Sequence, residues 1–299
     1  MSTGLKQTPV AAAPIVYKRP SQLKEIWRRM KKNRAAMIGL VILLIILFLA
    51  VFAEQIKPYE TAVSQNVRER LQTPTWAHPF GTDGYGRDLL ARCIHGGRVS
   101  LSIGFTSAGI SLVLGLILGS TAGYYGGKID SVIMRCIDVV AAIPSILMAL
   151  AVVAALGSSR LNLILAVSFA RTPAVIRVVR TSVLSVGDHE YVEAARAGGT
   201  GDIRIIAKSI LPNAMGPIMV QATMSVAQNI LSAATLSFLG LGINPPTPEW
   251  GAIISESKEF MRTAYYLMVF PGLMIILSTL SLNLVGDGLR DALDPRLKS

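Results

Sequence analysis

The residues best suited to specific polar contacts form one stretch, residues 190–212, which reads EYVEAARAGGTGDIRIIAKSILP. It is the one long polar interruption in the second half of an otherwise apolar chain. Glu190 lies near the positive end of an expected short helix and Arg196 in its last turn, where each charge suits the helix dipole, and Asp188 is expected to cap that helix. These residue types favour docking against another surface over bond-breaking chemistry.

Small residues leave one face of this expected helix nearly bare. At helical spacing that face holds Tyr191, Ala194, Ala195 and Gly198. Another protein could therefore approach the backbone closely. A tight bend is expected next, because three glycines follow in short order: Gly198, Gly199 and Gly201.

A second amphipathic helix is expected after the bend. Its apolar stripe would consist of Ile203, Ile206, Ala207 and Ile210. Arg204 and Lys208 lie four apart on the other side, and Pro212 ends this helix or kinks it into the next segment. Spacing alone is equally compatible with an ordinary amphipathic hairpin between two membrane spans.

A second polar motif lies earlier in the chain, in residues 78–101, HPFGTDGYGRDLLARCIHGGRVSL. Its glycines allow a tight turn in which Asp83 accepts backbone hydrogen bonds. Arg87 and Asp88 are expected to open an interfacial helix. A nucleotide-binding loop is excluded, because no Lys-Ser or Lys-Thr follows and no strand is expected before it.

The remaining polar residues form no catalytic or metal-binding pattern. The three histidines are far apart along the chain, and Cys93 and Cys136 match no metal spacing, so no metal site is expected. The chain has no phosphate-binding loop and no nucleophile with a base and an orienting partner. We therefore expect neither an enzyme nor a cofactor in this chain.

The elements that position these motifs are membrane spans. The chain has 299 residues, of which 52% are hydrophobic and 16% charged, and a mean hydropathy of +0.51. This profile indicates a polytopic membrane protein. The net charge of +11 does not indicate nucleic-acid binding, because the basic residues lie beside apolar runs, as the positive-inside rule describes. The first apolar run begins near Met37 without a cleavage site after it, so it is expected to be a retained span.

The hydropathy pattern predicts an all-α fold with six transmembrane helices and both termini in the cytoplasm. Five of the expected spans cover about residues 35–53, 99–122, 132–156, 216–239 and 265–285. The fourth span in chain order starts near residue 162 and fades through Arg171, Pro173, Arg177 and Arg180. The expected divisions are a cytoplasmic tail with a basic amphipathic helix (1–34), the first span (35–53), an extracytoplasmic segment (54–98), a five-helix membrane core (99–290) that includes the cytoplasmic stretch 181–212, and a cytoplasmic tail (291–299).

Polar residues within the spans are candidates for lining a path. Gln221, Gln228 and Asn229 lie in the fifth span, where such groups line water or bond to neighbouring helices. Asp138 lies one turn from Arg135, which favours a structural ion pair over a substrate site. Trp250 is expected at the membrane interface.

Two motifs resemble one known family. Glu193, Ala194, Ala195 and Gly199, followed after a gap by Ile210, Leu211 and Pro212, resemble the EAA loop of permease subunits of ABC importers, although the usual residue between isoleucine and Leu-Pro is absent. The stretch before the second span resembles the GTD-x-x-GRD motif of the dipeptide, oligopeptide and nickel branch, through Gly81, Thr82, Asp83, Gly86, Arg87 and Asp88. The resemblance covers about Met37 to the end and implies the type I ABC importer permease fold.

The resemblance implies that the EAA stretch, with Glu190 and Tyr191, is a cytoplasmic helix-turn-helix that docks on an ATPase subunit. Glu193 would orient the loop by hydrogen bonding, Ala194 and Ala195 would permit close seating, and Gly199 would allow the turn. The implied partners are a second related permease, two ABC ATPase subunits that hold ATP and Mg²⁺, an extracytoplasmic solute-binding protein and a peptide substrate. The implied location is the bacterial or archaeal cytoplasmic membrane, and no nucleic acid is involved.

Three alternatives stay open at this point. The cargo could be nickel instead of a peptide. An ion-coupled secondary transporter is disfavoured, because the spans lack deeply placed acidic groups and inverted repeats. A signalling or scaffold membrane protein would not need the two motifs.

Overall fold

The protein is a bundle of helices. The computed structural model describes residues 22–293, and within this range the regular structure is helical apart from one isolated bridge between Thr82 and Asp88. Five segments are long and apolar enough to cross a membrane. They are α2 (Arg34–Val51), α5 (Leu89–Tyr125), α8 (Arg160–Gly187), Asp202–Phe238, which ends in α11 (Leu211–Phe238), and α13 (Tyr266–Leu293). The expected terminal tails lie largely outside the described residues.

Shorter helices complete the bundle. They are α1 (Gln22–Met30), α3 (Ala53–Ile56), α4 (Tyr59–Val63), α6 (Gly127–Ala141), α7 (Ser145–Leu156), α9 (Glu190–Ala197), α10 (Asp202–Ile205) and α12 (Trp250–Glu256). Three-residue 3-10 turns lie at Val67–Glu69 and Lys258–Phe260, and a π-helical turn covers Ile206–Ile210.

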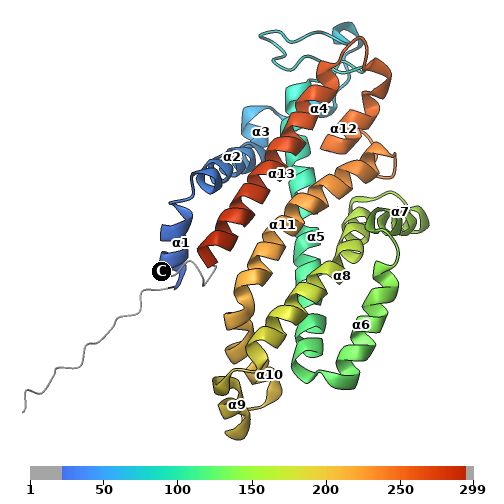
Figure 1. Ribbon diagram of the computed structural model, residues 1–299. Coiled ribbons are helices and arrows are strands. Elements are labelled where there is room, and N and C mark those ends of the chain that lie inside the picture. Colours follow the sequence, from blue (N-terminus) through green and yellow to red (C-terminus); the bar gives the residue numbers. More distant parts are fainter. Residues whose placement is uncertain (1–21, 294–299) are drawn as a thin grey trace, which may run out of the picture.

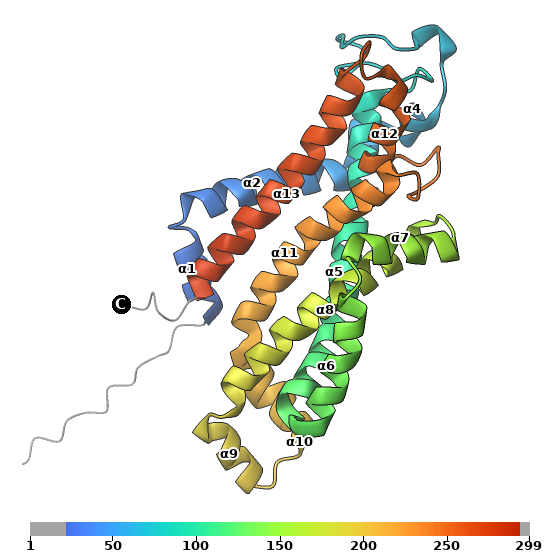
Figure 2. The same cartoon turned by 45° about the vertical axis from the view of Figure 1, so that its right-hand side comes forward.

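The long helix α5 runs through the molecule between two polar ends (Figure 1). At one end lie residues 54–88, called here the cap segment, together with α12 and the start of α13. At the opposite end lie α9 and α10, which belong to residues 190–212, called here the polar hairpin. Figure 2 shows the same separation from a second direction. The two motifs found in the sequence therefore lie at opposite ends of one helical bundle.

The expected third span, residues 132–156, is not one straight helix. It consists of α6 and α7, which are bent by 80° at a short break, and the six-span total is reached only if this pair counts as one span. Pro144 stands at the break with φ −51° and ψ 131°. A proline disfavours helical geometry in the residue before it and cannot donate a backbone hydrogen bond, which explains the interruption.

Three further expected boundaries are wrong. α5 begins at Leu89, so the expected limit between residues 98 and 99 falls inside a helix and no separate interfacial helix exists there. The expected turn at residues 123–130 shrinks to Gly126, whose φ of 60° allows α6 to begin at once. The fourth span does not fade at its arginines, because α8 continues through Pro173 to Gly187.

A stripe of small residues brings α5 and α8 into close contact. Gly115, Gly119 and Gly123 lie one turn apart on α5 and face Val175, Val179 and Val183 of α8. A Cβ atom added at Gly119 would lie 2.8 Å from the carbonyl oxygen of Ile176 and 2.8 Å from the Cβ of Val179. In a membrane, where helices gain little from hydrophobic burial, such close packing is a main source of association.

We expect Gly119→Val to destabilise the protein by about 1–3 kcal/mol, because the new side chain has no room between α5 and α8. Thermal unfolding of the detergent-solubilised protein measures this. The matched control is Gly109→Val in the same helix, where an added Cβ meets no atom within 4 Å. Equal melting temperatures of the two variants would contradict the packing role of the stripe.

Candidate functional site

The first arm of the polar hairpin is α9, which is anchored by one side chain. Val192 is 0% exposed and packs with Ile205, Ile210 and Val183 in one apolar cluster. The helix is N-capped by the backbone at His189, whereas Asp188 is the C-cap residue of α8, so the expected Asp188 cap is wrong. The face opposite the anchor is left open to solvent.

The residues named by the EAA resemblance divide between that open face and the core. Glu190, Tyr191, Glu193, Ala194, Gly199 and Pro212 are exposed, Ala195 and Leu211 are half-buried, and Ile210 is buried. Within residues 22–293 the Glu193 carboxylate makes no hydrogen bond, so its expected role in orienting the loop stays a prediction, whereas Val192 anchors the helix to the core. The small-residue face is free to receive another surface.

Gly199 makes the turn of the hairpin possible. Its φ is +73°, a conformation that residues with a Cβ rarely adopt. The turn closes through hydrogen bonds from the Gly199 N–H to the Arg196 carbonyl at 3.0 Å and from the Thr200 N–H to the Ala195 carbonyl at 3.1 Å. An added Cβ at Gly199 would meet nothing within 4 Å, so the requirement for glycine is conformational and not steric.

The second arm differs from the expected stripe. Ile205 and Ile210 are the buried residues, while Ile203 is 83% exposed and Ile206 only half-buried. The reason is the π-helical turn Ile206–Ile210, which shifts the register and in which the Leu211 N–H donates to the Ile206 carbonyl. Pro212 follows directly and has no N–H to donate, so the ordinary i→i−4 backbone hydrogen bond is missing at this position. The helix then continues into α11 without a break.

The hairpin is also fastened to the end of α5. Tyr124 Oη donates to Asp202 Oδ1 at 2.7 Å and Tyr125 Oη to Asp202 Oδ2 at 3.2 Å. The guanidinium of Arg196 lies over the Tyr124 ring, 4.7 Å from its centroid. These contacts join both arms of the hairpin to α5.

The GTD-x-x-GRD residues form the core of the cap segment. Asp83 accepts backbone hydrogen bonds from Tyr85 at 2.8 Å and Arg87 at 3.0 Å, as the sequence predicts. Gly81 and Gly86 have φ of 80° and 76°. A Cβ at Gly86 would lie 1.8 Å from the Asn66 carbonyl oxygen, so only glycine fits there.

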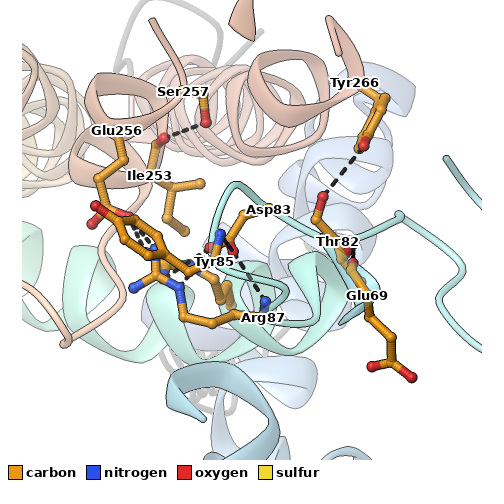
Figure 3. Close-up of polar contacts among 10 residues, drawn as sticks. Glu69, Thr82, Asp83, Tyr85, Arg87, Ile253, Glu256, Ser257 and Tyr266 are labelled. Atoms are coloured by element: carbon orange, nitrogen blue, oxygen red, sulfur yellow. Dashed lines mark hydrogen bonds and ion pairs between the residues drawn. The ribbon is translucent and has the colours of Figure 1, made fainter. Parts of the chain in front are cut away.

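The charges of this motif are paired (Figure 3). Arg87 Nε donates to Asp83 Oδ2 at 2.6 Å, and Arg87 also donates to Glu256 Oε2 from α12. Arg92, which is fully buried, adds a contact to Glu256 at 3.1 Å. This set, called here the cap cluster, joins the cap segment to α12 across 169 residues of sequence.

The other motif residues fix the ends of the cap segment. Asp88 caps α5 by accepting from the Ala91 N–H at 2.8 Å, and its second oxygen contacts Lys57 at 3.1 Å and His78 at 2.9 Å. Thr82 accepts from the Gln72 N–H and donates to the Glu69 carbonyl. Tyr266 Oη of α13 donates to the Gln72 carbonyl at 2.9 Å and the Thr82 carbonyl at 3.3 Å.

Two expectations about single residues are wrong. Trp250 is 1% exposed and donates from Nε1 to the Cys93 carbonyl at 2.8 Å, so it is a core residue and not an interfacial anchor. Asp138 pairs with Arg177 of α8 at 2.8 Å and not with Arg135. The ion pair therefore joins two helices, α6 and α8.

The three candidate path residues lie in different environments. Asn229 is fully buried between α11 and α5, where its amide is placed to contact the Ser225 carbonyl and the Ala108 N–H, so it belongs to the helix interface and not to an open face. Gln221 is half-buried and donates to Ser225 at 3.3 Å. Gln228 is exposed and accepts a hydrogen bond from Arg171 at 3.1 Å.

Three functional candidates escaped the sequence reasoning. Glu256 and Arg92 complete the cap cluster, and nothing in their local sequence links them to it. Arg171 was interpreted as the end of a span, although its single charge inside an apolar helix was a usable signal.

Comparison with known proteins places the chain among membrane transport components. Residues 112–299 match the family described as "Binding-protein-dependent transport system inner membrane component", and residues 21–74 match the "N-terminal TM domain of oligopeptide transport permease C". The chain is 43% identical to the di/tripeptide transport system permease protein DppC of Pseudomonas aeruginosa, covering 99% of this chain and 98% of that one.

Two further similarities support the comparison. The chain is 44% identical to the dipeptide transport system permease protein DppC of Alkalihalophilus pseudofirmus, covering 95% of this chain and 93% of that one. The fold is similar to an inward-facing MetNI methionine ABC transporter chain, with a TM-score of 0.56, 20% identity, and coverage of 69% of this chain and 96% of that one.

We expect Glu256→Gln to destabilise the cap by about 3 kcal/mol, because it leaves Arg87 and Arg92 buried with only Asp83 as an acidic partner. Limited proteolysis of residues 54–88 and thermal unfolding measure the loss. The control is Glu259→Gln, an exposed residue that removes the same charge three positions away. Equal effects of the two changes would show that the buried pairing contributes nothing.

Proposed function

The chain belongs to the binding-protein-dependent transport system inner membrane components, and we propose that it is the permease subunit of an ATP-driven importer of dipeptides or oligopeptides. The names of the relatives support the peptide cargo, since three that cover 95–99% of this chain are described as dipeptide or di/tripeptide permeases. Nickel is less well supported, because the relatives compared are named for peptides or glutathione.

Membership of this family supports the following proposed assembly. The chain would cross the cytoplasmic membrane several times, pair with a second permease and dock on two ABC ATPase subunits that hold ATP and Mg²⁺. An extracytoplasmic solute-binding protein would deliver the peptide. The excess of basic residues beside the first span favours a cytoplasmic amino terminus, and the polar hairpin then lies on the same side.

The observation that carries the proposal is the polar hairpin itself. It offers an exposed face of small residues, yet it is fixed to the bundle by Val192, by the Asp202 contacts and by its direct continuation into α11. A surface that is both open and rigid suits the transfer of displacement from a partner to the membrane helices. An isolated signalling hairpin would not need this fixation.

The mechanism is alternating access. ATP would close the two ATPase subunits, the hairpins docked on them would move together, and the helices attached to the hairpins would open the path to the outside. Exposed Glu190, Tyr191 and Ala194 supply the docking face, and Gly199 fixes the angle between the arms. The cap segment, at the other end, is the surface that we assign to the solute-binding protein.

The direct test is uptake. Cells that lack their own dipeptide importers and express this chain with its partner subunits should accumulate labelled dipeptide only when the ATPase subunits are active. Uptake that continues with ATPase subunits unable to hydrolyse ATP would exclude an ATP-driven permease.

We expect Gly199→Val to assemble normally but to lose most of its uptake per ATP hydrolysed, because a β-branched residue at φ +73° forces the turn to change. Peptide uptake and ATPase activity are measured on the same vesicles. The control is Gly201→Val, two residues away, where φ is −64° and an added Cβ also meets nothing within 4 Å. Normal coupling in the Gly199 variant would show that the angle between the two arms of the hairpin is not needed to couple ATP hydrolysis to uptake.

A further inference from the structure

Arg171 of α8 is a positive charge placed deep in the apolar part of the bundle. It lies about 17 Å along α8 from Arg160, at about 1.5 Å per residue, in a helix of 28 residues. Arg177 and Arg180 of the same helix each pair with an aspartate of α6. Arg171 has no acidic partner within residues 22–293, which leaves its charge available.

Neutral groups hold Arg171 in place. Its Nη1 donates to Gln228 Oε1 at 3.1 Å and its Nη2 to Ser232 Oγ at 3.1 Å, both from α11 and one helical turn apart. The third guanidinium nitrogen, Nε, is buried and has no hydrogen-bond partner in the described part of the chain. We call these three residues the Arg171 cluster. It fixes a guanidinium in one orientation without neutralising it.

The Arg171 cluster does not lie on the side of α8 that suits lipid. The exposed apolar side chains in this part of α8 are Leu161, Leu165 and Phe169, which follow one another at four-residue spacing. At about 100° per residue, Arg171 points about 160° away from Phe169 and about 120° away from Leu165, the two members of that row nearest to it in depth. A charge at this depth avoids lipid and faces protein or water.

An open groove lies further along the same side of α8. Val178 and Ser185 follow Arg171 at seven-residue spacing and line this groove of about 370 Å³, together with Arg177, Thr181, Ser182 and Pro217. Its surface is mostly apolar, so the Arg171 cluster is the polar feature of this side of the helix.

We propose that Arg171 faces the translocation path and attracts the carboxylate groups of the peptide in transit, with Gln228 and Ser232 as positioning residues. The inference rests on the proposed function. Because the charge is unpaired, it favours peptides with an extra carboxylate over those with an extra amine. The permease thus adds a charge preference of its own to that of the solute-binding protein.

The test compares two dipeptides in the complete transporter. Labelled Ala-Glu and Ala-Lys are supplied to cells that express the permease pair, the ATPases and the solute-binding protein, and the ratio of the two initial uptake rates is measured. The preference of the binding protein is the same in every variant and divides out. We expect Arg171→Gln to lower the Ala-Glu to Ala-Lys ratio by about fivefold, the size of one charge contact near water.

Two further variants separate charge from structure. Arg171→Lys keeps the charge and is expected to keep the ratio. Gln228→Glu keeps the arginine but gives it an acidic partner, and is expected to lower the ratio as Arg171→Gln does. If Arg171→Gln fails to assemble, the ratio measured for Gln228→Glu tests the proposal by itself. The control is the double change Arg180→Gln with Asp130→Asn, which removes a paired arginine of the same helix and is expected to leave the ratio unchanged.

The outcomes are distinguishable. An unchanged ratio in Arg171→Gln or Gln228→Glu overturns the proposal, and it is also the result expected if an acidic residue of the second permease pairs with Arg171. An equal fall in Arg171→Lys and Arg171→Gln overturns it as well, since it would point to guanidinium geometry and not to charge. A wild-type complex that imports neither dipeptide refutes the proposed function itself.

Discussion

The lipid interior offers no hydrogen-bond partners, and this constraint arranges the polar groups of the protein. Hydroxyl groups within the helices donate to carbonyls, as Thr172 does to Ser168 at 2.8 Å within α8 and Ser111 does to Ser168 at 2.9 Å across the α5–α8 contact. Charged groups gather at the two ends of the bundle or pair between helices, as Asp138 and Arg177 do. Arg171 stands out against this background, because within residues 22–293 its charge has no acidic partner and its Nε has no hydrogen-bond partner.

The two polar ends are held in shape by different interactions. The cap segment has little regular structure, so its shape depends on buried charges and on glycines at positive φ, with Glu256 of α12 completing the set. The polar hairpin depends on apolar anchoring instead, with Val192 and Ile210 in the core and small exposed residues above them. A rigid backbone with a bare surface is the arrangement that close docking requires.

The sequence predicts well what depends on neighbours along the chain. The apolar runs placed the first span, expected at 35–53, within two residues of α2 (Arg34–Val51), whereas α5 begins ten residues earlier and α13 ends eight residues later than expected. The glycines and Asp83 indicated the turn of the cap segment. The partners of charged residues were not predictable in this way. Arg135 is the local candidate for Asp138, but the packing of α6 against α8 brings Arg177 closer, and no spacing rule contains that contact.

The remaining differences have equally physical causes. A hydropathy window averages over Pro144, so it joined two helices that are bent by 80°. A single arginine in an apolar run suggested the end of a span, yet α8 continues because Arg171 finds acceptors on α11. The burial of Trp250 likewise depends on α5, more than 150 residues away in the chain.

One consequence follows from the continuity of α5. Its first turn is capped by Asp88 of the cap segment, and its last residues, Tyr124 and Tyr125, hold Asp202 of the polar hairpin. A helix of 37 residues is about 55 Å long and resists stretching along its axis. The protein therefore has one rigid helix that joins its two polar ends, so a tilt imposed at the end beside the polar hairpin also displaces the end beside the cap segment.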